Sequence, residues 1–297
     1  MRITDKAMSD NFMSSVNQAR ERIVDLQTKI ATGKSVQKPS DDPRATNAIL
    51  RLQASLASNS QYSDNVADGS GVAQATSQTL DQFSSIFLQL KDIVTRASNP
   101  TMQGEYTTYA QQVDQLLSEA INSANTKFDG KYIFGGTQTT DPPYTLASDR
   151  MSVAKNPNGI DGTINYAVGD GLTQQVNIPG EEAFQGKGLF DLLIQVRDTL
   201  NSGSAPQTAQ VDAVNSGYDH IVMEGSKAGA FVQNMDNLST HLDDQKTQLT
   251  QFLSNEQDSD LAQSVTTLKQ EETMLEAALN TGAQTIPKTL LDFLQSA

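Results

Sequence analysis

Two adjacent aspartates, Asp41 and Asp42, stand between prolines in the string KPSDDPRATNAI at residues 38–49. Neighbouring carboxylates could act as an acid and base pair or could bind a metal ion. Either role requires further groups that converge on the pair. The chain has only two histidines, His220 and His241, and no recognisable motif surrounds either. The sequence therefore predicts neither a catalytic nor a metal-binding role for these aspartates.

The rules for helix ends account for the same residues without any chemistry. Gly33 is suited to a left-handed C-cap of a first helix, and Pro39 prevents that helix from continuing. Asp42 followed by Pro43 is typical of an N-cap and the first helical position. Asp41 adds a carboxylate near the positive end of the helix dipole. We therefore predict that Asp41, Asp42 and Pro43 form a helix cap motif.

Other candidate sites have weaker support. The glycines of FGG at residues 134–136 lack the strand-to-helix context of a dinucleotide loop, and no phosphate-binding lysine follows a glycine run. Nothing fixes the separation of Glu181 and Glu182, as a carboxylate pair would require. A glycan hydrolase would need two acids at a defined separation, whereas three aspartates lie in a turn-rich context: Asp149, Asp161 and Asp170. We predict no catalytic, cofactor-binding or metal-ligating residue, and no enzyme activity.

Composition narrows the class of protein. The 297 residues carry a net charge of -14, contain 6% aromatic residues, and include neither tryptophan nor cysteine. Disulfides and thiolate chemistry are excluded, and an acidic chain does not attract nucleic acid or anionic lipid. The first residues lack the apolar core of a signal peptide, and no apolar run is long enough to span a bilayer. We expect protein partners, no nucleic acid and no membrane insertion.

Both ends of the chain show the heptad spacing of helices that pack lengthwise on another helix. At the C-terminal end, Glu272 interrupts the apolar pattern, which continues at Ile286, Leu290 and Phe293. Ala19 belongs to the N-terminal pattern. The residues that we predict to form a contact seam are Phe12, Val16, Ile23, Leu26 and Ile30 near one end, and Leu261, Val265, Leu268, Leu275 and Leu279 near the other.

Two arrangements could cover these apolar faces. Most amphipathic helices serve the core of their own chain, which favours an intramolecular bundle. Chain ends, however, are usually frayed and polar, so apolar heptads that run almost to both termini favour contacts with neighbouring subunits. We therefore predict an inter-subunit seam, with the intramolecular bundle as the alternative.

The middle of the chain changes from helical spacing to a turn-rich segment and back to helical spacing. Helical spacing runs through residues 80–94 and 106–124, gives way to a segment rich in glycine and proline, and returns after about residue 189. Short runs such as RMSVAK, TINYAV and LTQQVNI, divided by NPNG and GDG, predict small strands with tight turns. The sequence predicts a mainly α fold with three parts: terminal coiled-coil helices at 1–40 and 255–297, a central helical domain at 41–135 and 188–254, and an inserted small β domain at 136–187.

The stretch LQTKIATGKSVQKPSDDPRATNAIL, from residue 26, resembles the N-terminal block of bacterial flagellins and their relatives. In that family a terminal helix ends at Thr-Gly or Ser-Gly, an aspartate-rich loop follows, and a long helix carries an N-A-x-D-G step. These features match Thr32-Gly33, residues 39–45 and residues 65–69. The C-terminal string from residue 255 is similar to the flagellin C-terminus. The strings MRITDKAMSDNFMSSV and FDGKYIFGGTQTTDPPY resemble the hook-associated members of the family more than flagellin.

The resemblance implies a structural protein with an elongated hairpin of long helices and an outer β-rich domain. It implies secretion through the flagellar type III export apparatus from the cytoplasm, and a place at the hook-filament junction. The implied partners are the first hook-filament junction protein, flagellin, neighbouring copies in a ring and a cytosolic export chaperone. Two other functions stay open: a flagellin filament subunit, or a secreted type III tip or adhesin-like binding protein.

Overall fold

The computed structural model describes residues 2–285 of the chain. The chain divides into two compact units, one made of residues 1–57 and 247–297 and the other of residues 58–246. Two long helices contribute to both units, α2 (Pro43–Ala97) and α6 (Thr208–Gln257). Each unit is described by itself below.

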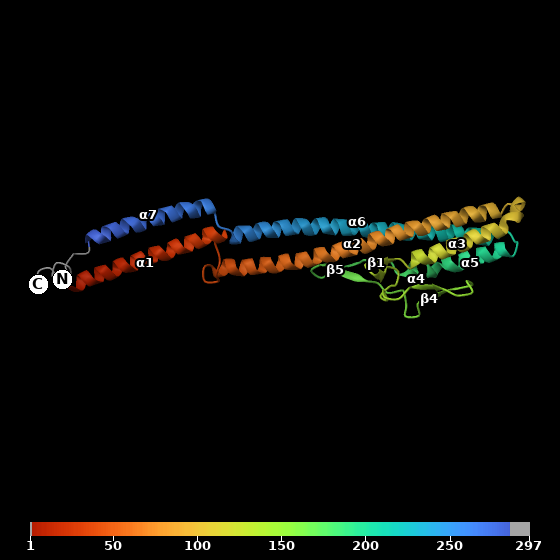
Figure 1. Ribbon diagram of the computed structural model, residues 1–297, viewed down its shortest axis with the longest axis horizontal. Coiled ribbons are helices and arrows are strands. Elements are labelled where there is room, and N and C mark those ends of the chain that lie inside the picture. Colours follow the sequence, from red (N-terminus) through yellow and green to blue (C-terminus); the bar gives the residue numbers. More distant parts are fainter. Residues whose placement is uncertain (1, 286–297) are drawn as a thin grey trace. The chain divides into compact units, whose positions relative to one another are not determined.

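The first unit is built from helices at the two ends of the chain. Helix α1 (Arg2–Thr32) lies beside α7 (Leu261–Thr285), and the two run in opposite directions (Figure 1). The first turns of α2 and the last turns of α6 complete this unit, with Ala45 and Ile49 of α2 buried. Because a lone amphipathic helix is marginal in water, the pairing of distant segments is what stabilises each of them.

The second unit contains a helical core. The remainders of α2 and α6 pack with α3 (Tyr106–Ala124) and α5 (Leu189–Asn201), and a short 3-10 helix, η1 (Pro100–Glu105), leads into α3. Apolar residues follow one face of each helix, as the spacing at 80–94 and 106–124 predicted. The largest buried cluster includes Leu80, Phe87, Leu90, Val113, Leu117, Leu193, Val196 and Ile221.

An aromatic group occupies the centre of this cluster. Phe184 follows the short helix α4 (Gly180–Ala183) and precedes the 3-10 turn η2 (Gln185–Lys187). Its ring centroid lies 4.4 Å from that of Phe83 on α2 and 4.7 Å from that of Phe134. Tyr144 and Phe190 approach the same ring at 6.0 and 5.9 Å. Phe184 therefore connects the inserted segment to the helical core.

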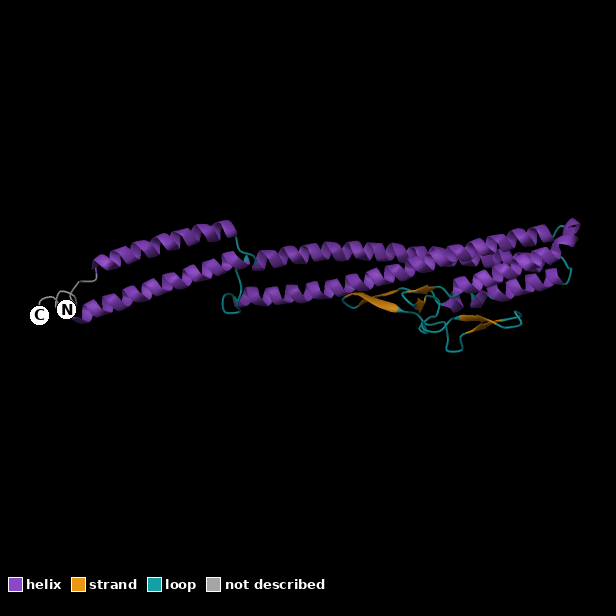
Figure 2. Ribbon diagram, viewed as in Figure 1, coloured by secondary structure: helices purple, strands orange, loops and turns teal. Residues whose placement is uncertain are grey.

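The strands form three separate antiparallel hairpins (Figure 2). They pair β1 (Lys127–Phe128) with β2 (Lys131–Tyr132), β3 (Tyr144–Leu146) with β4 (Val153–Lys155), and β5 (Asn165–Gly169) with β6 (Leu172–Gln175). The strands predicted from RMSVAK, TINYAV and LTQQVNI are confirmed as β4, β5 and β6.

The β5–β6 hairpin packs against a second, smaller cluster on α2 and α6, formed by Val66, Val168, Val176, Met235 and Leu242. The segment NVADG of α2, residues 65–69, makes this contact possible. Asn65 Nδ2 donates to Ala167 O at 2.7 Å, and a Cβ atom at Gly69 would lie 2.9 Å from Val176 Cγ1. The hairpin approaches so closely that only glycine fits at position 69 without a shift.

An ion-pair network holds the β3–β4 hairpin. Arg150, at its tip, adopts a positive φ of 58° and pairs with Asp114 of α3 at 2.8 Å. Arg197 of α5 is almost fully buried, pairs with the same carboxylate at 3.2 Å and donates to Arg150 O at 2.7 Å. No sequence pattern indicates this network, because its members come from three distant segments.

The mainly α fold with small inserted β elements is confirmed. The β1–β2 hairpin begins at Lys127, before the segment 136–187 predicted as the β domain. The division into three parts stays a prediction.

Replacing Phe184 with alanine should lower the free energy of unfolding by about 3–5 kcal/mol, because it removes the central ring and leaves a cavity between α2 and the inserted segment. Urea denaturation followed by circular dichroism measures the loss. Leu172→Ala, at an exposed position of β6, is the control and should stay within about 0.5 kcal/mol of the wild type. Equal effects of the two substitutions would contradict the central position of Phe184.

Candidate functional site

The paired helices α1 and α7 hold most of the residues that the sequence predicted to make contacts. Three links show how they align. Phe12 lies against Gly282, Arg22 pairs with Glu271, and Gly33 O accepts a hydrogen bond from Ser259 N at 2.8 Å. The Arg22 guanidinium binds both carboxylate oxygens of Glu271, each at 3.1 Å. Successive contacts thus join residues near opposite ends of the sequence along the whole pair.

The predicted residues of α1 lie on one face of the helix. Val16 is buried, as is Ala19 between the predicted positions, while four others are partly buried: Phe12, Ile23, Leu26 and Ile30. This is the face that Phe12 turns toward α7. The α1 pattern therefore lies within the helix pair of a single chain.

On α7 the contact face is displaced around the helix relative to the predicted one. Leu268 and Leu275 are partly buried and lie on the same face as Glu271 and Gly282, which contact α1. Leu261, Val265 and Leu279 are 49%, 45% and 41% exposed. We call these three exposed side chains the outer stripe of α7. The contact-face residues that the prediction missed are small or polar, so no apolar pattern marked them: Ser264, Glu271, Ala278 and Gly282.

Further large apolar side chains of this unit are exposed. They are Met13 and Val24 on α1, Leu50 on α2, Phe252 on α6 and Met274 on α7. A pair of helices can cover only one face of each member, and the described residues of this unit leave these side chains exposed. Exposed apolar surface of this extent is typical of a region that contacts another protein.

The loop between α1 and α2 has the predicted geometry at Gly33 and Asp42. Gly33 adopts a φ of 71°, and its N–H donates to Lys29 O at 2.9 Å. Asp42 Oδ1 accepts hydrogen bonds from the N–H groups of Arg44 at 2.8 Å and Ala45 at 3.0 Å, and α2 begins at Pro43. These bonds, led by that from Ala45, lower the pKa of Asp42.

Asp41 binds the loop that precedes α2. Its Oδ2 accepts hydrogen bonds from Lys38 N at 2.9 Å and Gln37 N at 3.1 Å, so it closes the loop before the helix. The bond from Lys38, followed by that from Gln37, lowers the pKa of Asp41. The two carboxylates therefore bind different backbone segments, which stabilises their ionised forms.

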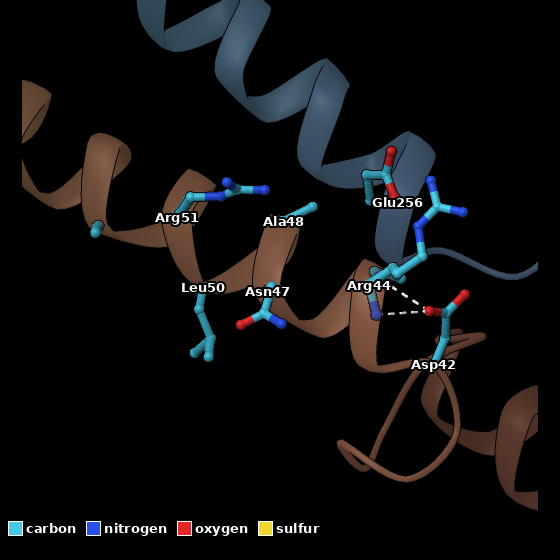
Figure 3. Close-up of a pocket in the computed structure, with 9 residues that line it drawn as sticks. Asp42, Arg44, Asn47, Ala48, Leu50, Arg51 and Glu256 are labelled. Carbon is cyan, nitrogen blue, oxygen red and sulfur yellow. Dashed lines mark hydrogen bonds between the residues drawn. The ribbon is translucent and has the colours of Figure 1, made fainter.

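A surface hollow of about 900 Å³ lies beside this cap, between the first turns of α2 and the end of α6 (Figure 3). Arg44, Arg51 and Glu256 line it, together with Asn47 and small alanine side chains. In Figure 3 the Leu50 side chain points away from α6. The hollow is polar and open, and the groups around it do not form an acid and base pair.

The two histidines have no common site. His220 Nε2 makes a hydrogen bond with Glu182 O at 3.0 Å, while His241 is exposed on α6. Glu181 pairs with Lys155 at 3.1 Å, and Glu182 pairs with Lys227 at 2.5 Å. The carboxylates of Glu181 and Glu182 therefore form two separate ion pairs.

The glycines of FGG, residues 134–136, form a turn. Gly135 N donates to Tyr132 O, and Gln138 N donates to Gly135 O at 2.8 Å. Asp149 Oδ1 accepts a hydrogen bond from Met151 N, two residues on. Asp161 and Asp170 lie in loops, the latter between β5 and β6.

Residues 2–285 contain neither a metal-binding cluster nor a membrane span. No group of three or more His, Cys, Asp or Glu side chains in this part of the chain could hold a metal ion. No described helix is long and apolar enough to cross a membrane.

Comparison with known families and proteins gives consistent matches. Residues 3–139 match the bacterial flagellin N-terminal helical region. Flagellar hook-associated protein 3 of Escherichia coli is 21% identical over 300 residues, which cover 94% of this chain and 95% of that protein. The same protein of Salmonella typhimurium is 27% identical over 150 residues, 50% of this chain and 47% of that protein. Flagellins match at 19% identity.

Solved structures share the fold. The flagellar junction protein of Legionella pneumophila superposes with a TM-score of 0.60 at 14% identity, over 71% of this chain and 100% of that one. At this identity the likeness concerns the fold alone.

Replacing Gly282 with alanine should weaken the pairing of α1 with α7. The added Cβ atom would meet the ring of Phe12, so the helices must separate or the ring must turn away. Cross-linking of cysteines introduced at positions 15 and 278 would report the separation as a lower yield. The double variant Phe12→Ala with Gly282→Ala should recover the yield, because it removes the obstructing ring. Failure of this rescue would contradict the register in which α1 pairs with α7.

Proposed function

We propose that this chain is a member of the flagellin superfamily, and that it is a structural junction protein between the hook and the filament of the bacterial flagellum, as its similarity to flagellar hook-associated protein 3 supports. The observation that carries the proposal is the outer stripe of α7. It presents three large apolar side chains to solvent on a helix whose neighbouring face already contacts α1.

The energetics of the helix pair support a contact with other subunits. Burying apolar surface contributes about 25 cal/mol per Å², and this unit leaves much of its apolar surface in water. Among the side chains of this unit that the structure describes, the buried apolar ones are short or branched: Val16, Ala19, Ala45 and Ile49. Neighbouring helices from other copies would cover the outer stripe as heptad packing requires.

The ten predicted seam residues then divide into two groups. Those on α1, with Leu268 and Leu275, hold the helix pair of one chain together. Leu261, Val265 and Leu279 contact neighbouring subunits. The inter-subunit seam is therefore narrower than the whole set, and α1 contributes to it through Met13 and Val24 on its exposed side.

The role in the flagellum is structural. The partners are copies of the same chain in a ring, the first hook-filament junction protein on the hook side, and flagellin on the filament side. Before assembly the chain is cytoplasmic and bound to an export chaperone, and the flagellar type III apparatus exports it. The chain is not an enzyme and uses no cofactor.

A flagellin filament subunit is the alternative function, because flagellins match the chain at 19% identity. A filament subunit and a junction protein differ in whether copies add to copies without limit.

Glutamates at Val265 and Leu279 should abolish filament assembly and motility while the protein still folds, because charge cannot be buried in an apolar contact without a large cost. Complementation of a strain that lacks the gene, scored by swimming and by electron microscopy of hooks, measures the effect. Gln263→Glu, which adds the same charge at an exposed polar position of α7, is the control and should leave swimming normal. Normal filaments on cells with the double variant would contradict the proposed stripe.

Seeded polymerisation distinguishes a junction protein from flagellin. Purified chain added to hook fragments with the first junction protein in place should bind once and then stop. Light scattering should therefore rise to a plateau at an early stage, whatever the excess of free chain. Long filaments of this chain alone would instead assign it as a filament subunit.

A further inference from the structure

A second side of α1, next to its contact with α7, carries two exposed apolar side chains and an arginine. Met13, Arg20 and Val24 follow in steps of seven and four, so they lie above one another on the helix. Met13 is 52% exposed and Val24 is 59% exposed. Arg20 makes no ion pair with any residue that the structure describes. We call these three side chains the outer side of α1.

The outer stripe of α7 has an acidic residue at its centre. Glu272, which interrupts the apolar pattern, stands seven residues after Val265 and seven residues before Leu279, about two helical turns in each direction. Within the chain its Oε2 pairs with Lys269 of the same helix at 3.0 Å. Exposed pairs of this kind contribute little to stability. Glu272 is therefore able to bind an arginine from another molecule.

The charges and the apolar side chains of these two surfaces match in one antiparallel register. When Arg20 is placed opposite Glu272, Met13 lies opposite Leu279, because each stands seven residues away in the corresponding direction. An apolar contact alone would tolerate a shift along the helices, whereas an ion pair at its centre fixes the register. The outer side of α1 therefore complements the outer stripe of α7 in charge as well as in apolar character.

The register inside the chain supports the match. Phe12 contacts Gly282 and Arg22 pairs with Glu271, and this alignment differs by no more than two residues from the one that joins the outer surfaces. Copies related by rotation about an axis along the helices keep all their α1 helices parallel. The α1 of a neighbouring copy is then antiparallel to α7 and at the same level, as the match requires.

We propose that a second copy of this chain covers the outer stripe of α7 with the outer side of its α1, and that Arg20 of that copy pairs with Glu272. This inference rests on the proposed function and names the partner of its contact surface. Each copy carries both halves of the contact, so the contact can repeat from copy to copy in a ring. The apolar side chains on either side of the ion pair exclude water from it, and salt then screens it less than an exposed pair.

Cross-linking between two variants tests the contact. The chain has no cysteine, so Met13→Cys in one full chain and Leu279→Cys in a differently tagged one are the only thiols of the two chains. Assembled together on hook fragments that carry the first junction protein, they should form a disulfide under mild oxidation. Met274→Cys, exposed on another face of α7, replaces Leu279→Cys in the control and should give a several-fold lower yield. Equal yields would overturn the proposal.

Exchange of the two charges tests the ion pair. Arg20→Glu or Glu272→Arg, introduced alone into both chains, brings like charges together and should lower the disulfide yield several-fold. Both substitutions in the same chains restore opposite charges and should recover the yield. Circular dichroism checks that each variant has the helix content of the wild type. A double variant that cross-links no better than the single ones would show that Arg20 does not pair with Glu272.

Failure of this contact differs from failure of the proposed function. If glutamates at Val265 and Leu279 abolish filaments while the disulfide forms no better than in the control, a different protein covers the outer stripe, and the second copy is excluded. Normal filaments on cells with these glutamates would instead contradict the stripe itself.

Discussion

The pairing of helices from distant parts of the sequence is the constraint on which this structure depends. A long helix with one apolar face is stable in water only when another segment covers that face. In residues 58–246 four helices and the aromatic group around Phe184 provide this cover, so the large side chains are buried. Among the described residues of the other unit, α1 and α7 cover one face of each other, and the outer stripe of α7 is left exposed.

The two units differ in how completely their apolar side chains are buried, and this difference bears on the proposed assembly. The aromatic core gives the middle of the chain a fixed structure of its own. The terminal pair has a shallow contact strengthened by the bidentate link between Arg22 and Glu271, and it offers apolar surface to neighbours. A subunit that folds before it joins its neighbours benefits from both properties.

Polar side chains determine where α2 begins and how a loop and a hairpin are attached, which the spacing of apolar residues does not specify. Asp42 fixes the start of α2, Asp41 closes the loop that precedes it, and Asn65 attaches the β5–β6 hairpin to α2. Each accepts from or donates to backbone groups. The hydrogen bond between His220 Nε2 of α6 and Glu182 O of α4 belongs to the same class.

The sequence by itself determined the mainly helical fold, the strands at β4, β5 and β6, the N-cap at Asp42 and the apolar face of α1, because these follow from spacing and from local rules for helix ends and turns. Its resemblance to the flagellin superfamily is confirmed. Only the tertiary structure decided which face of α7 meets α1, since Ser264, Glu271 and Gly282 form a contact that no hydrophobic pattern indicates. The network of Asp114, Arg150 and Arg197, and the meeting of Glu182 with His220, likewise join residues far apart in sequence, whose proximity depends on how the helices pack.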